Sequence, residues 1–106
     1  MYKAVFIDMD GTLLRKDHTV SSATKAAIHQ LTKQGVLVVP ISARPLHGML
    51  HITNDLLPAG NPVVSLNGSY IYQQESIIYR INMSLTETLA VHDLTEQQPV
   101  SVMYYS

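Results

Sequence analysis

Two aspartates separated by one residue follow a short apolar segment near the start of the chain, in the stretch KAVFIDMDGTLL. Placing the carboxylates of Asp8 and Asp10 close together at the end of a buried strand costs free energy unless a cation or a reaction offsets their repulsion. Mg²⁺ prefers hard carboxylate oxygens, takes only one or two of them from a protein, and bridges to substrate phosphate. The acidic pair therefore indicates phosphoryl chemistry assisted by Mg²⁺.

Composition limits the partners that this chemistry could serve. The chain has 106 residues, a net charge of −1 and no cysteine, and only 14% of its residues are charged. This length predicts one small domain with one core. The missing surplus of basic residues argues against nucleic acid as a partner. Because no apolar run approaches the roughly 20 residues of a membrane span, we expect a cytoplasmic protein without a membrane partner.

Apolar segments and helical patterns alternate along the chain, which predicts an α/β fold built from βαβ units. The expected elements are a buried strand at 3–7, an amphipathic helix at 21–35, a buried strand at 36–41, a helix at 45–57, a strand at 63–66, a hairpin at 69–81, a helix at 84–97 and a strand at 100–105. Right-handed crossovers make the first two strands neighbours in a parallel sheet.

Polar side chains stand where the predicted parallel strands end. Asp8 and Asp10 follow the first strand, Ser42 the second and Asn67 the third. Ligands of open parallel sheets bind beyond the carboxyl ends of the strands, so these residues are candidates for one site. Taken singly, each has a structural alternative: Asp10 in a turn with glycine, Ser42 as a helix cap, and Asn67 in a left-handed turn. Those alternatives leave the repulsion between Asp8 and Asp10 unexplained.

The stretch DMDGTLL resembles motif I (DxDGT) of the haloacid dehalogenase-like (HAD) phosphohydrolases, and ISARP and SLNGSYIY resemble the corresponding segments of their Cof-type branch. The resemblance implies a Rossmann-like, parallel, three-layer core that is incomplete here, followed by a β-hairpin and the start of a cap domain. It also implies that Asp8 is the nucleophile that becomes an aspartyl phosphate and that Asp10 is the general acid and base. Mg²⁺ would be held by the Asp8 side chain and the Asp10 backbone carbonyl.

The same resemblance implies residues that bind the substrate. Ser42 matches the motif II hydroxyl that binds phosphate, and Arg44 and Asn67 match positions near the substrate. Gly11 and Gly68, which lie in the same motifs, complete the predicted substrate-binding set. The implied function is a Mg²⁺-dependent phosphomonoester hydrolase that acts on a small phosphorylated metabolite.

Two further family motifs, a lysine and an acidic pair, cannot be placed after residue 44. We therefore interpret residues 1–82 as the N-terminal part of the core and 83–106 as the beginning of a cap domain, in a truncated chain with little activity alone. One alternative is a non-catalytic fragment. Another is a phosphoacceptor signalling domain, which would need an aspartate at the end of the third strand, where Leu66 and Asn67 stand.

The resemblance also implies that the strand at 3–7 is central in the complete family sheet and lacks one neighbour here. An apolar edge with unpaired backbone groups is rarely left bare. We therefore expect self-association, either edge to edge about a two-fold axis or by exchange of the hairpin and the 84–106 segment.

Overall fold

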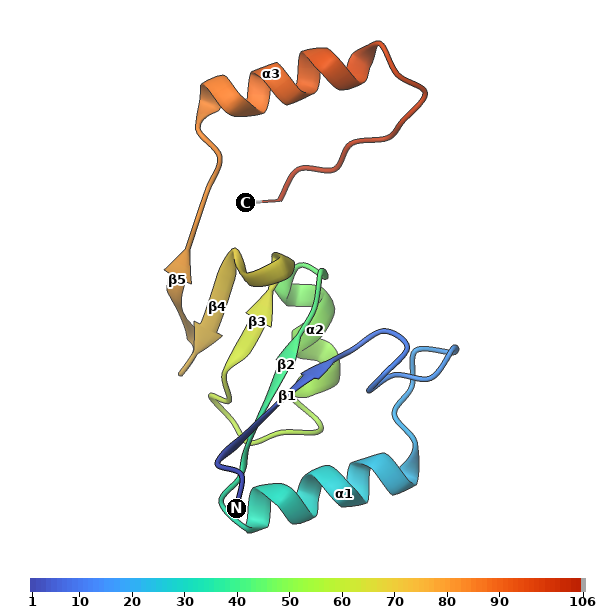
Figure 1. Ribbon diagram of the computed structural model, residues 1–106, viewed down its shortest axis with the longest axis vertical. Helices are drawn as coiled ribbons and strands as arrows, with labels where there is room; N and C mark the ends of the chain where they lie inside the picture. The colour runs from blue at the N-terminus through green and yellow to red at the C-terminus, as the bar shows by residue number, and fades with distance from the viewer. Residues whose placement is uncertain (106) are drawn as a thin grey trace.

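A computed structural model describes residues 1–105 (Figure 1). The elements along the chain are β1 (Ala4–Asp8), α1 (Ser22–Lys33), β2 (Leu37–Ile41), α2 (Leu46–Thr53), β3 (Val63–Ser65), the 3₁₀ turn η1 (Leu66–Gly68), β4 (Tyr70–Gln73), β5 (Ser76–Arg80) and α3 (Leu85–Glu96). The βαβ units and the hairpin that the sequence predicts are both present.

The strands form one mixed sheet in the order β1-β2-β3-β4-β5. β1, β2 and β3 are parallel, with Asp8 paired to Ile41 and Ile41 paired to Val64. β4 and β5 continue the sheet as antiparallel strands. The expectation of a parallel sheet thus holds for three strands, and the hairpin makes the whole sheet mixed.

Both α1 and α2 cover the same face of this sheet. Ile28 of α1 and Met49 of α2 join Val38 and Val63 in a single buried cluster. Two right-handed crossovers that move in the same direction across a sheet place their helices on one face. The described residues therefore form two layers, a sheet and the helices on one of its faces, and the third layer of the predicted incomplete core is not among them.

The opposite face of the sheet carries apolar side chains without a covering helix. We call it the open face, and by the alternation of the strands it comprises Phe6, Leu37, Val39, Ile41, Val64, Ile71 and Tyr79, of which Val39 is 3% exposed. Phe6 is 64% exposed and Tyr79 48% exposed. The prediction that residues 3–7 are a buried strand is wrong at Phe6, because β1 lies at the edge of the described sheet and no helix within residues 1–105 covers Phe6 on this face.

The helix boundaries follow local capping signals. The Ser21 side chain accepts a hydrogen bond from Thr24 N, and α1 is followed by Gly35 with a φ of +79°. α2 ends at Thr53, earlier than the predicted residue 57, and the chain continues as turns with Leu57 N bonded to Thr53 O at 2.9 Å. Asn54 and Asp55 favour turns over helix, although Leu57 still packs into the core.

The C-terminal part of the chain stands apart from this core. Figure 1 shows α3 lying away from the sheet, with the following residues running back beneath the helix. No residue of α3 is buried. The predicted strand at 100–105 is wrong, because these residues have no neighbouring strand to pair with and form no ladder. Ser106, the last residue of the predicted cap segment, lies outside the described residues.

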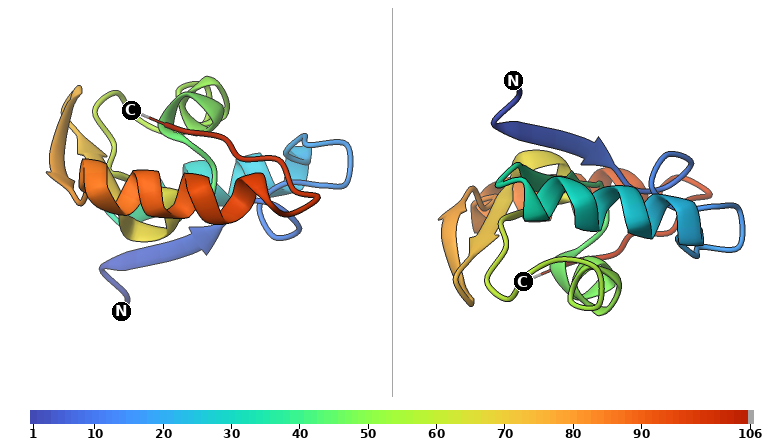
Figure 2. Two further views of the ribbon diagram at one scale, coloured as in Figure 1. Left: turned by 90° about the horizontal axis from the view of Figure 1, so that it is seen from above. Right: turned by 90° about the horizontal axis from the view of Figure 1, so that it is seen from below.

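The view from above and the view from below both place β1 and α2 on opposite sides of the molecule (Figure 2). The molecule is elongated, with extents of 50 × 30 × 23 Å. None of the helices within residues 1–105 is long and apolar enough to cross a bilayer.

We predict that Ser84→Ala unravels α3 and leaves the core unaffected. Ser84 and Glu87 form a reciprocal capping box, and α3 has no buried side chain to stabilise it otherwise. Losing such a cap costs about 1 kcal/mol, so amide exchange within α3 should accelerate about fivefold. Hydrogen exchange measures the helix, and the denaturation midpoint measures the core.

Ser21→Ala is the matched control, because it removes the equivalent cap from α1, which packs on the core through Ile28. We expect this variant to lower the denaturation midpoint. A lower midpoint for Ser84→Ala as well would contradict the independence of α3.

Candidate active site

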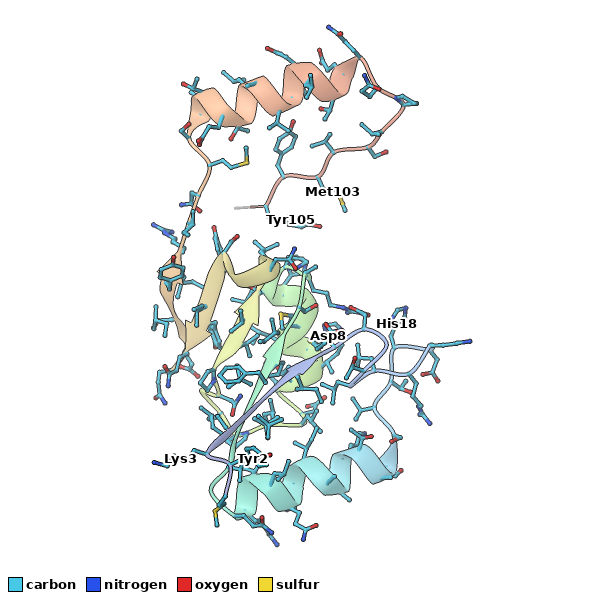
Figure 3. The ribbon with its side chains drawn as sticks, viewed as in Figure 1. Tyr2, Lys3, Asp8, His18, Met103 and Tyr105 are labelled. Carbon is cyan, nitrogen blue, oxygen red and sulfur yellow. The ribbon has the colours of Figure 1, made fainter. Side chains whose placement is uncertain are left out.

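The loop after β1 is fixed to the core by its apolar residues. Met9 is fully buried, and Leu13 and Leu14 are each 2% exposed. Leu13 N donates to Asp8 O at 3.1 Å, and Leu14 N donates to Met9 O at 2.8 Å. Because Met9 points inward between them, the carboxylates of Asp8 and Asp10 both face solvent. Figure 3 shows Asp8 at the end of β1.

Asp8 keeps most of its carboxylate available. Its one side-chain partner among the described residues is the hydroxyl of Thr12, which donates to Oδ2 at 3.4 Å. Gly11, which shapes the turn between them, has a φ of +79° that other residues rarely adopt. An exposed carboxylate on a rigid strand end is suited to act as a nucleophile or a metal ligand.

Asp10 is held by Arg44 in a bidentate ion pair. Arg44 Nε donates to Oδ2 at 2.8 Å and Nη2 donates to Oδ1 at 2.7 Å. Arg44 is steadied in turn by Nη1, which donates to the Gly48 carbonyl at 3.2 Å. The hydrogen bonds from Arg44 hold the pKa of Asp10 below its usual value, and they raise the pKa of Arg44. Asp10 is therefore an ionised carboxylate in this structure.

His18 joins this pair, although no motif or spacing in the sequence selects it. Its Nδ1 lies 3.5 Å from Asp10 Oδ1 and 3.3 Å from Arg44 Nη2. Figure 3 shows the residue on the loop beside Asp8. His18 has a φ of 63°, a left-handed conformation in a loop closed by the hydrogen bonds between Asp17 and Thr19. No periodicity or motif in the sequence points to this long-range contact.

The loops after β2 and β3 are joined by backbone hydrogen bonds. Asn67 N donates to Ser42 O, and Leu66 N donates to Arg44 O, both at 3.1 Å. Asn67 is in the predicted left-handed conformation with a φ of 55°, and Gly68 follows with a φ of +93°. Gly11 and Gly68 thus shape the backbone of the predicted site.

Ser42 is 4% exposed, and its hydroxyl accepts a hydrogen bond from Arg44 N at 3.0 Å. The alternative role of Ser42 as the cap of α2 is wrong, because the N-cap is Pro45 and has no side-chain hydrogen bond. Ser42 instead tightens the loop that presents Arg44 to Asp10. The structure therefore brings the ends of β1, β2 and β3 together, as the strand order predicts.

The oxygen donors at this end of the sheet fit a hard cation in small number. Within the described residues there is no group of three or more metal-ligating side chains. The Asp10 carboxylate is occupied by Arg44, whereas the Asp8 carboxylate is exposed. An exposed carboxylate of this kind fits Mg²⁺, which takes one or two carboxylates from the protein, and the Asp10 carbonyl stays a predicted ligand.

A cleft of about 560 Å³ lies between the hairpin and the segment after α3. Its lining includes Leu66 and Tyr70 from the core side and Met103 and Tyr105 from the other. Arg80 supplies a cation to this otherwise largely apolar wall. The cleft begins next to the turn that carries Asn67, and Figure 3 shows Met103 and Tyr105 on the segment that faces it.

The sequence profile described as haloacid dehalogenase-like hydrolase matches residues 5–106. The chain belongs to the haloacid dehalogenase-like hydrolases. The match covers nearly the whole chain and includes the loop with both aspartates, and the Cof-type resemblance of the later motifs agrees with it.

Individual HAD-like relatives support the assignment. A Haemophilus influenzae protein that is provisionally named as a phosphatase is one such relative. It is 37% identical over 108 aligned residues, which cover 100% of this chain and 41% of the relative. The structure of a haloacid dehalogenase-like hydrolase from Bacillus subtilis is 27% identical with a TM-score of 0.79, over 89% of this chain and 33% of that one. A sugar phosphatase of HAD subclass IIB is 26% identical with a TM-score of 0.73, over 90% of this chain and 37% of that one.

The chain therefore spans between one third and about two fifths of the length of these HAD-like relatives. The N-terminal part of their fold is present, and the solved relatives superpose on the mixed sheet and its helices.

We predict that removing Arg44 raises the pKa of Asp10. Arg44 is the main cause of its lowering, so Asp10 in Arg44→Ala should titrate closer to 3.8. In the wild type, the carboxylate stays charged to lower pH than an isolated aspartate, and the ion pair is lost as the pH falls through the lowered pKa. Carbon NMR of the Asp10 carboxyl group during an acid titration measures this directly.

Arg15→Ala is the matched control, since Arg15 contacts Asp17 and Thr19 in the adjacent loop and makes no contact with Asp10. This variant should leave the Asp10 titration unchanged. An Asp10 that titrates identically with and without Arg44 would contradict the ion pair.

Proposed function

We propose that this chain carries the nucleophile and acid-base half of a Mg²⁺-dependent phosphomonoester hydrolase that acts on a small phosphorylated metabolite. The observation that carries the proposal is that two aspartates one residue apart have different surroundings: one carboxylate is available and the other is held in an ion pair. Asp8 has an exposed carboxylate with one weak partner, whereas Asp10 is fixed by two short hydrogen bonds from Arg44. Membership of the HAD-like hydrolases supports this division.

In the first step, a carboxylate oxygen of Asp8 attacks phosphorus and the bond from phosphorus to the leaving alcohol oxygen breaks. The alcohol oxygen takes a proton from Asp10, and the phosphoryl group remains on Asp8 as an acyl phosphate. In the second step, Asp10 accepts a proton from water as the water oxygen attacks phosphorus. Phosphate leaves, and Asp8 is restored.

Arg44 determines which of these steps Asp10 is ready for. The ion pair keeps Asp10 ionised, which suits the second step, whereas the first step requires a protonated Asp10. A phosphate group offers a guanidinium the same bidentate geometry as a carboxylate. We propose that incoming phosphate draws Arg44 away from Asp10, so that substrate binding and protonation of Asp10 occur together.

Mg²⁺ fits the same strand end, and HAD-like hydrolases generally depend on it. Asp8 through its carboxylate and Asp10 through its carbonyl are the groups that would hold it. Bound there, Mg²⁺ supplies positive charge that offsets the repulsion between a carboxylate and an anionic phosphate. Ser42 supports the phosphate side through the loop that carries Arg44.

The phosphoacceptor alternative finds less support. Such a domain would place its aspartate at the end of β3, where Ser65 is fully buried and is followed by η1. The non-catalytic alternative is decided by the experiment below.

We predict that Asp8→Asn abolishes phosphatase activity. An amide is neither a nucleophile nor an anionic ligand, so the hydrolysis of p-nitrophenyl phosphate with Mg²⁺ should fall by at least about 1,000-fold. The assay should use the protein as its cell makes it, including any residues that follow this sequence.

Asp17→Asn is the control, because Asp17 is an exposed acid in the same loop whose side chain contacts Thr19 and Arg15. We expect full activity from this variant. Full activity in Asp8→Asn would refute the assignment of Asp8 as the nucleophile, whereas no hydrolysis by the unaltered protein would favour the non-catalytic alternative.

We also predict near-background activity for the 106-residue chain alone. Each missing phosphate-neutralising or metal-binding group should cost several kcal/mol of transition-state stabilisation. Purified chain at high concentration, compared with its own Asp8→Asn variant, measures the difference. A robust rate that depends on Asp8 would show that residues 1–106 contain every group the reaction needs.

A further inference from the structure

The loop after β1 holds His18 in a fixed place. Leu14, before the loop, is 2% exposed, and Val20, after it, packs against the core, so both ends of the loop are anchored. Between these ends, Arg15 N donates to Thr19 O at 2.8 Å, and His18 N donates to Arg15 O at 2.9 Å. The His18 ring is therefore presented by a loop that is closed by its own hydrogen bonds.

One nitrogen of the His18 ring lies near two partners of opposite character. Nδ1 is 3.3 Å from Arg44 Nη2, which can only donate a hydrogen bond, and 3.5 Å from Asp10 Oδ1, which as a carboxylate oxygen can only accept one. A neutral imidazole carries its proton on one of its two nitrogens. Nδ1 can therefore accept from Arg44 when it is bare, or donate to Asp10 when it carries the proton.

Arg44 uses the same oxygen of Asp10 that faces His18. Its Nη2 donates to Oδ1 at 2.7 Å, whereas its Nε donates to Oδ2 at 2.8 Å. When phosphate draws Arg44 away, as proposed above, Asp10 loses both of these hydrogen bonds. A catalytic group that is displaced by about 1 Å can lose roughly 100-fold in rate, so Asp10 then needs another partner. His18 is the described side chain that remains beside Oδ1.

We propose that His18 is a positioning residue that takes the place of Arg44 at Asp10 Oδ1 when Arg44 turns to the phosphate. The ring stays neutral and changes tautomer: Nε2 gives its proton to water, and Nδ1 takes one from water and donates it in a hydrogen bond to Oδ1. Oδ2 is then the oxygen that gives a proton to the leaving alcohol. This inference rests on the proposed function, because phosphate is what draws Arg44 away.

The competing interpretation is that position 18 serves only the turn. His18 has a φ of 63°, a left-handed conformation that glycine and asparagine adopt more readily than other residues. Its side chain is also 68% exposed. This interpretation leaves the position of Nδ1 between a guanidinium and a carboxylate unexplained. It predicts that glycine and asparagine serve equally well at position 18.

Two variants of His18 separate these interpretations, in the protein as its cell makes it. His18→Asn and His18→Gly both suit the left-handed turn, but only asparagine carries a nitrogen on Cγ, as the imidazole does. Two esters of similar shape report on Asp10. The phenol that leaves from phenyl phosphate has a pKa of about 10, like the tyrosine side chain, and needs a proton from the acid. The more acidic p-nitrophenol needs little such help.

With Mg²⁺, His18→Gly should lower kcat/KM for phenyl phosphate by at least about tenfold and for p-nitrophenyl phosphate by less than about threefold. His18→Asn should restore most of the loss on phenyl phosphate. Equal losses on the two esters, or equal rates for the two variants, would overturn the positioning role. No hydrolysis of either ester by the unaltered protein would instead overturn the proposed function.

Nitrogen NMR of the imidazole rings tests the exchange of partners without turnover. At about pH 9 an imidazole of ordinary pKa is neutral, and the spectrum shows which nitrogen carries the proton. We expect the His18 proton on Nε2 in the unaltered protein and on Nδ1 in Arg44→Ala, where Asp10 is the partner that remains. His29, which is exposed on α1, should give the same spectrum in both proteins. The same His18 tautomer in both would overturn the exchange, whatever the activity of the protein.

Discussion

The burial of Met9 is the constraint on which the rest of the site depends. Met9 is fully enclosed by the core, so the residues on either side of it must point outward at the end of β1. The site is thereby coupled directly to the packing of α1 and α2, whose residues Ile28 and Met49 belong to the same cluster. A chemical group held by a loop is normally mobile, whereas these two acids are held with the rigidity of the core.

The ion pair between Arg44 and Asp10 connects two of the strand ends that the core positions. The repulsion between two neighbouring carboxylates is relieved on one side by Arg44, which arrives from the loop after β2 and neutralises Asp10. That loop is itself shaped by Ser42 and tied to η1 through Asn67. These hydrogen bonds connect the three strand ends. A change at one end would therefore shift the loop that carries Arg44 and alter its contact with Asp10. Asp8 keeps an exposed carboxylate with Thr12 as its side-chain partner among the described residues, and the proposed function assigns to it the attack on a phosphate ester.

The sheet is packed on one face only, and this asymmetry gives the described chain its unusual surface. Two crossovers of the same hand place α1 and α2 together, which leaves Phe6 and Tyr79 exposed on the other face of the described sheet. The C-terminal helix adds no packing to either face, since none of its residues is buried. The chain matches 41% of the Haemophilus influenzae relative, and the ends of β1, β2 and β3 lie within this part.

The sequence by itself determined the local features of this protein. Apolar runs, Ser21 and Ser84 as caps, and the turns at Gly11 and Asn67 are encoded within a few residues, and motif I indicated the HAD-like family and the two acids. Only the tertiary structure decided that Arg44 pairs with Asp10, that His18 joins them, and that residues 100–105 form no strand. These outcomes depend on contacts between residues far apart in the chain. Local propensity carries no information about such contacts, because each requires a particular arrangement of strands that the chain reaches only when folded.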